Sequence, residues 1–103
     1  VGYTYSDKQT ADTIKQVYGK TGYLLDPHGA VGYLGLKEYL KDKDAVGVFL
    51  ETAHPAKFLD VVEPIINEKI EIPQRLQDYI DRKKVAIEMK ADLGRLEEVL
   101  KGL

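Results

Sequence analysis

A short apolar run, AVGVFL at residues 45–50, constrains the fold more than any other feature of this sequence. The run has no polar alternation, which is typical of a β-strand that is covered on both faces and paired on both edges, as in a parallel sheet. The chain offers only two short candidate partners, residues 1–5 and KVAIEM at 84–89. A buried strand without its sheet predicts that the chain is a piece of a larger domain.

Helix-start signals dominate the rest of the sequence. Ser6 and Gln9 have the spacing of a capping box, and Asp26 followed by Pro27 is typical of an N-cap and a first helical residue. The expected helices begin near Ser6, Asp26, His54, Ile72 and Asp92. We therefore expect the α/β class in a mostly helical form, with about five helices around one or two short strands.

The expected second helix, through about Leu40, is unusual in carrying three glycines at a spacing of three. Gly29, Gly32 and Gly35 each cost roughly 1 kcal/mol of helix propensity relative to alanine. Such glycines indicate that something large packs closely against that face of the helix.

Composition excludes several classes of function. The 103 residues suit one small domain, and a net charge of −2 without a Lys/Arg cluster argues against nucleic-acid binding. The absence of cysteine excludes a thiol nucleophile and a cysteine zinc site, and fits a reducing, cytoplasmic location. No apolar stretch is long enough for a membrane. The N-terminus has no signal-peptide pattern and no initiator methionine, which suggests a cut chain.

Three blocks carry a family resemblance. SDKQT at residues 6–10, TGYLLDPHGAVG at 21–32 and TAHPAKF at 52–58 appear in the order and at the separation of the C-terminal portion of threonine synthase, which this chain resembles. Gly29 stands where that family more often carries Thr or Ala. The resemblance covers residues 1–66 well and 67–103 loosely. We therefore expect a single fragment, with 1–66 in the catalytic fold and 67–103 as a helical tail.

The resemblance implies a pyridoxal-phosphate enzyme of the tryptophan synthase β-like fold, which converts O-phospho-L-homoserine and water to L-threonine and phosphate. In that fold a hydroxyl at a strand end bonds the pyridine nitrogen of the cofactor, and Thr52 matches this position. Ligands of open α/β sheets do lie beyond the carboxyl ends of strands. From the residues alone, a helix cap is the commoner role for a threonine at a strand end. The Schiff-base lysine and the phosphate-binding loop lie outside this chain, and Lys57 matches a different family lysine.

Three further residues are candidates for lining the site: His54, Asp26 and His28. His54 could orient substrate or water, although a structural role at the helix start is the simpler interpretation. Asp26 is first of all a helix N-cap. Two histidines and one carboxylate make a weak metal pattern, so we expect no metal.

Two other hypotheses stay open from the sequence: a non-catalytic helical interaction module, and a small anion-binding domain that uses the helix starts at Pro27 and Pro55. A reading frame that continues upstream with a cofactor lysine would favour the enzyme. The expected partners are the rest of the threonine synthase chain and O-phosphohomoserine. Alone, the fragment is expected to self-associate through residues 45–51, or to cover them with residues 1–5 or KVAIEM.

Overall fold

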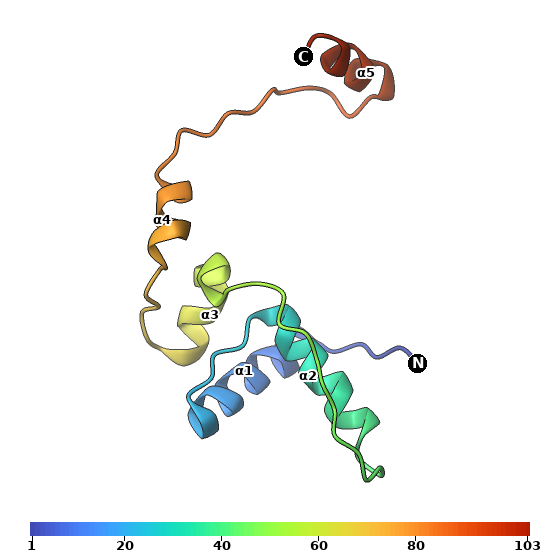
Figure 1. Ribbon diagram of the computed structural model, residues 1–103, viewed down its shortest axis with the longest axis vertical. Helices are drawn as coiled ribbons and strands as arrows, with labels where there is room; N and C mark the ends of the chain where they lie inside the picture. Colours follow the sequence, from blue (N-terminus) through green and yellow to red (C-terminus); the bar gives the residue numbers. More distant parts are fainter. The chain divides into compact units, whose positions relative to one another are not determined.

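The computed structural model describes all residues, 1–103, and forms two compact units, Val1–Pro73 and Gln74–Leu103 (Figure 1). The first unit holds α1 (Asp7–Thr21), α2 (Pro27–Tyr39), the 3-10 helix η1 (Pro55–Phe58) and α3 (Leu59–Ile66). The second holds α4 (Gln74–Ile80) and α5 (Leu93–Lys101). The five expected α-helices are therefore present. The assignment of residues 67–103 to a tail outside the catalytic fold stays a prediction.

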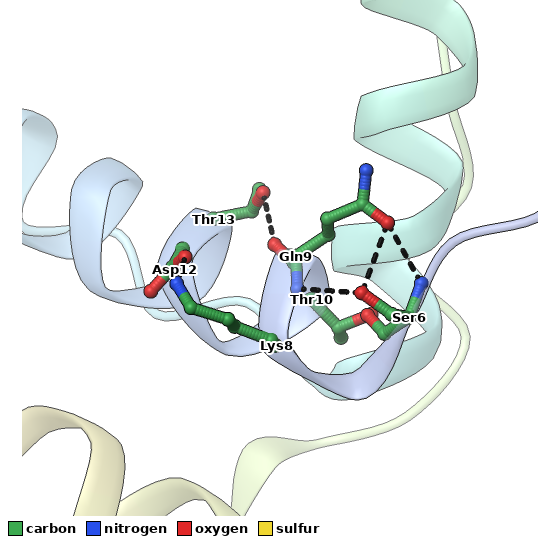
Figure 2. Close-up of polar contacts among 6 residues, drawn as sticks. All are labelled: Ser6, Lys8, Gln9, Thr10, Asp12 and Thr13. Atoms are coloured by element: carbon green, nitrogen blue, oxygen red, sulfur yellow. Dashed lines mark hydrogen bonds and ion pairs between the residues drawn. The ribbon is translucent and has the colours of Figure 1, made fainter.

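The expected capping box opens α1, as Figure 2 shows. The Gln9 backbone N–H donates to Ser6 Oγ at 3.3 Å, and the Ser6 backbone N–H donates back to Gln9 Oε1 at 2.9 Å. The helix ends at Gly22, whose φ of 72° places it in the left-handed region that glycine adopts without strain. Local capping rules alone therefore define both ends of α1.

The core of the first unit joins α1, α2 and α3. Its fully buried members are Ile14, Leu25, Ala30 and Val62. Ala30 lies in the first turn of α2 and Leu25 immediately precedes that helix, so the core holds the start of α2 firmly in place. Phe58, at the end of η1, packs against the same cluster. The two segments that matter for the site are therefore fixed to one core.

The expected β-strands are absent, which corrects the sequence-based expectation. Residues 45–50 run extended beside α2 but pair with no other segment, and residues 1–5 and 84–89 also form no strand (Figure 1). A strand needs backbone partners on a neighbouring strand. Because this chain places no second extended segment alongside residues 45–50, their backbone remains unpaired.

The close packing expected along the glycines of α2 is found at Gly29 only, whereas Gly32 and Gly35 make ordinary contacts. A Cβ atom on Gly32 would lie 3.7 Å from the Phe49 ring, and one on Gly35 would lie 3.5 Å from the Tyr3 ring. Residues 1–5 thus lie against α2 and not over residues 45–51, since the Tyr5 hydroxyl also donates to Glu38 Oε2 at 3.4 Å. The idea that residues 1–5 cover the extended segment is therefore wrong.

Residues 46–50 present two different faces. Gly47 and Phe49 point toward α2, where Phe49 meets Tyr33 edge-on at 5.8 Å between ring centroids. Val46, Val48 and Leu50 point away and are 97%, 82% and 78% exposed. The segment therefore has the period-2 geometry of a strand, but only one of its faces is covered, not both as expected.

The exposed row Val46, Val48 and Leu50 should make the isolated chain self-associate. An unpaired apolar segment is a template for pairing with a second copy. We expect sedimentation velocity to show association that increases with concentration and that Val48→Lys abolishes. Val85→Lys is the matched control, since Val85 is also an exposed valine, at 91%, and it should associate like the parent. A chain that stays monomeric while its amides at 46–50 exchange freely would contradict this expectation.

Candidate functional site

Asp26 organises the start of α2. Its side chain has no exposed surface. Asp26 Oδ1 accepts the backbone N–H of His28 at 2.8 Å and lies 2.9 Å from His28 Nδ1. Pro27 follows as the first helical residue, where a missing N–H costs nothing. The expected role of Asp26 as N-cap of this helix is therefore confirmed, while its place in a ligand site stays a prediction.

Glu51 joins the extended segment to this helix start. Its Oε1 accepts the backbone N–H of Asp26 at 2.8 Å. Its other oxygen lies directly over Gly29, so that a Cβ atom at position 29 would overlap the carboxylate. This contact joins the block at residues 21–32 to Glu51, the residue that directly precedes the block at 52–58.

Sequence reasoning missed Glu51. The only signals were a glycine in the first turn of an apolar helix and an acidic residue directly after an apolar run. Neither signal shows that the two positions meet, because they are 22 residues apart in the chain. The contact becomes visible only once residues 47–49 lie against α2.

The neighbouring carboxyl groups of Asp26 and Glu51 shift each other's pKa. Burial, followed by the hydrogen bond to Asp26, raises the pKa of Glu51 to about 7. Burial also acts to raise the pKa of Asp26, but hydrogen bonds from Glu51 and from the His28 and Gly29 backbone lower it overall. The buried oxygens Asp26 Oδ2 and Glu51 Oε2 have no hydrogen-bond partner. A proton on Glu51, donated to Asp26, would satisfy both of these atoms.

Thr52 and His54 follow Glu51 and have different surroundings. His54 Nδ1 accepts the backbone N–H of Ala56 at 3.1 Å, so His54 is the N-cap of η1. Thr52 is exposed and takes no part in that cap. The alternative interpretation of Thr52 as a helix cap is therefore wrong, and the structural role foreseen for His54 is confirmed.

His28 lies in the first turn of α2, next to Phe58 of η1. Its ring is 5.2 Å from that of Phe58, and its side chain is 68% exposed. It borders a hollow of about 530 Å³ between α1, α2 and α3. Asp26, His28 and Glu51 therefore form one cluster, with Thr52 and His54 next along the chain. No three His, Asp or Glu side chains gather in a way that could hold a metal.

Comparison with known proteins identifies the family. A family model described as "Threonine synthase, C-terminal" matches residues 29–100, which include Glu51, Thr52 and His54. The chain belongs to the threonine synthase family. It is 46% identical over 76 residues to threonine synthase of Buchnera aphidicola, covering 74% of this chain and 17% of that protein. It is 41% identical over 95 residues to threonine synthase of Haemophilus influenzae, covering 92% of this chain and 22% of that protein.

Two solved threonine synthases have the same fold. The Escherichia coli structure matches with a TM-score of 0.87 and 33% identity, over 99% of this chain and 24% of that one. The Brucella melitensis structure, which has pyridoxal phosphate bound, matches with a TM-score of 0.69 and 37% identity. The match covers 93% of this chain and 20% of that one. The chain thus spans about a fifth of the length of these threonine synthases. No helix in it is both long enough and apolar enough to cross a membrane.

Proposed function

We propose that this chain is the C-terminal part of a threonine synthase that converts O-phospho-L-homoserine and water to L-threonine and phosphate. The chain supplies one wall of the pyridoxal-phosphate site and lacks the Schiff-base lysine. The observation that carries the proposal is the Thr52 hydroxyl, which is exposed at the end of an extended segment and is not used to cap η1.

Thr52 fits the cofactor chemically. Pyridoxal phosphate, when bound, supplies the electron sink for the reaction, and the protein tunes this property through the partner of the ring nitrogen. The Thr52 hydroxyl is neutral, so it can donate its proton in a hydrogen bond to that nitrogen without protonating it. An Asp in the same place would favour the protonated ring. Thr52 therefore moderates the electron demand of the ring and helps to fix its orientation.

The rest of the threonine synthase chain is the proposed partner of residues 46–50. In the full-length protein this segment pairs as a strand with neighbours from outside the chain, and the row Val46, Val48 and Leu50 is covered by them. The alternating geometry of the segment and its exposed apolar row support this. His28 and His54 would face the substrate O-phosphohomoserine.

Replacing Thr52 in the full-length enzyme tests the proposed cofactor contact. Thr52→Ala removes one hydrogen bond, which is worth on the order of 1 to 3 kcal/mol and roughly ten- to a hundredfold in rate. We expect phosphate release at saturating cofactor to fall by that factor. The free energy of unfolding should hardly change, because Thr52 is exposed.

The control is Thr52→Ser, which keeps the hydroxyl and should retain most of the activity. A Thr52→Ala enzyme with the parental turnover number would show that Thr52 does not contact the cofactor.

A further inference from the structure

We propose that Glu51 is a positioning residue for Thr52: its carboxyl, anchored at the start of α2, fixes the direction in which the Thr52 hydroxyl points. The proposal rests on the proposed cofactor contact of Thr52 and extends it to a residue that touches no cofactor. Three features of the structure support it.

The first feature is the direction of the two side chains. In an extended chain, successive side chains point to opposite sides. Glu51 points inward, with Oε1 2.8 Å from the Asp26 backbone nitrogen, and Thr52 is exposed. Because the Glu51 side chain is held against the start of α2, the Thr52 side chain points away from α2, toward solvent.

The second feature is that Thr52 lies between two fixed points. On one side Glu51 accepts the backbone N–H of Asp26, and on the other His54 accepts that of Ala56. Each anchor ties a side chain of this segment to a backbone group of a helix start. Only Ala53 separates Thr52 from the second anchor. Releasing Glu51 would leave Thr52 fixed from one side only.

The third feature is that the anchor is buried and fitted to its place. Glu51 Oε2 and Asp26 Oδ2 are both buried and have no hydrogen-bond partner. A proton held on Glu51, whose pKa is raised to about 7, would satisfy both oxygens. Asp26 is in turn held by the His28 backbone N–H. Gly29 leaves the space that the carboxyl fills. With that proton in place the network would be fully satisfied and therefore rigid, and the anchor could fix the turn.

The test uses the full-length enzyme and two measurements, the affinity of the apoenzyme for pyridoxal phosphate and the absorption spectrum of the bound cofactor. Glu51→Ala should lower the affinity roughly tenfold, since small misplacements of a contacting group have effects of this size. Glu51→Gln should bind within about twofold of the parent, because its amide can accept from the Asp26 N–H and donate to the Asp26 carboxylate.

Gly29→Ala provides a second variant that leaves Glu51 unchanged. Its methyl group occupies the place of the carboxyl, so it should displace Glu51 and reproduce the loss of affinity, while alanine favours the helix. Glu63→Ala is the matched control. Glu63 is also a partly buried carboxylate that accepts a backbone N–H, from Ile70 at 3.0 Å. Its loss should leave the cofactor affinity unchanged.

The pH dependence gives a further readout. The proton on Glu51 stabilises the folded anchor below the ordinary pKa of 4.5, and this stabilisation is lost as pH rises through about 7. The titratable groups near Glu51 are Asp26, whose backbone N–H it accepts, and His28, which contacts Asp26, with His54 and Lys57 close along the chain. Of these, only Asp26 hydrogen-bonds Glu51. From pH 6 to 8.5 the cofactor affinity of the parent should fall relative to that of Glu51→Gln.

A double variant separates this inference from the proposed function. If Glu51 acts through Thr52, Glu51→Ala should cause no further loss of affinity in a Thr52→Ala background. Parental affinity and spectrum in Glu51→Ala, with a clear defect in Thr52→Ala, would overturn the positioning role alone. A full additional loss in the double variant would also overturn it. Parental behaviour of Thr52→Ala would overturn the cofactor contact itself. Should Glu51→Ala not fold, Gly29→Ala and the pH comparison with Glu51→Gln decide the question.

Discussion

Purified alone, the 103-residue chain should release no phosphate from O-phosphohomoserine and should not bind pyridoxal phosphate covalently at any single lysine. The proposed site needs a Schiff-base lysine, and the lysine nearest to Thr52 along the chain is Lys57, which is exposed on η1. A lysine becomes a good nucleophile when burial or a neighbouring cation lowers its pKa. An exposed lysine on a helix surface has neither.

Phosphate release measured at high protein concentration, together with borohydride trapping and intact mass, tests this expectation. The full-length enzyme is the positive control, and it should show both turnover and one trapped cofactor per chain. Stoichiometric trapping on the isolated chain that disappears when one particular lysine is replaced would contradict the prediction. It would also place the cofactor lysine within these residues.

Asp26→Ala should be the most destabilising of the substitutions considered for the isolated chain. It removes the N-cap of α2, which is worth about 0.5 to 2 kcal/mol. It also removes the carboxylate that would receive the proton of the partly buried Glu51 carboxyl, which costs about 1 to 3 kcal/mol. We expect the free energy of unfolding, measured with urea at pH 6, to fall by about 2 to 4 kcal/mol, a large part of the stability of a small domain.

Ser6→Ala is the matched control for this measurement. Ser6 is also an N-cap in the first unit, but it is exposed and bonds only within its own helix (Figure 2). Its replacement should cost about 1 kcal/mol. Equal losses for the two variants would show that Asp26 is only a cap and that its contact with Glu51 adds nothing to stability.

Helix starts were the most predictable part of the fold. The box at Ser6 and Gln9, the cap at Asp26 and the cap at Asp92 all depend on residues within a few positions of one another. Such short-range hydrogen bonds form wherever the chain lies, so the sequence alone reveals them. The tight contact at Gly29 was foreseen for a related reason, since a costly glycine in a helix suggests a close neighbour, but Gly32 and Gly35 have only ordinary contacts.

The strands could not be predicted from this chain because a strand is defined by its partners. AVGVFL has the composition of a buried strand, but the partners that would confirm it are not among residues 1–103. Because both faces of the segment are apolar, the sequence does not show which face is covered. In the structure Phe49 contacts Tyr33 of α2, whereas Val48 is exposed. Only the packing of the segment against α2 separates the two faces.

The candidate site was foreseen in its residues but not in its connections. Asp26, His28, Thr52 and His54 were all singled out, but Glu51 was not. Its partner, Asp26, is 25 residues away. Contacts at that separation depend on tertiary packing, which no local rule describes.

The cap that begins η1 also determines the tautomer of His54. Because Nδ1 accepts the Ala56 N–H at 3.1 Å, it carries no proton of its own. In the neutral ring the single proton is therefore on Nε2. A group that approaches the outer edge of the His54 ring meets an N–H donor and must itself be an acceptor, as an oxygen of a phosphate ester is.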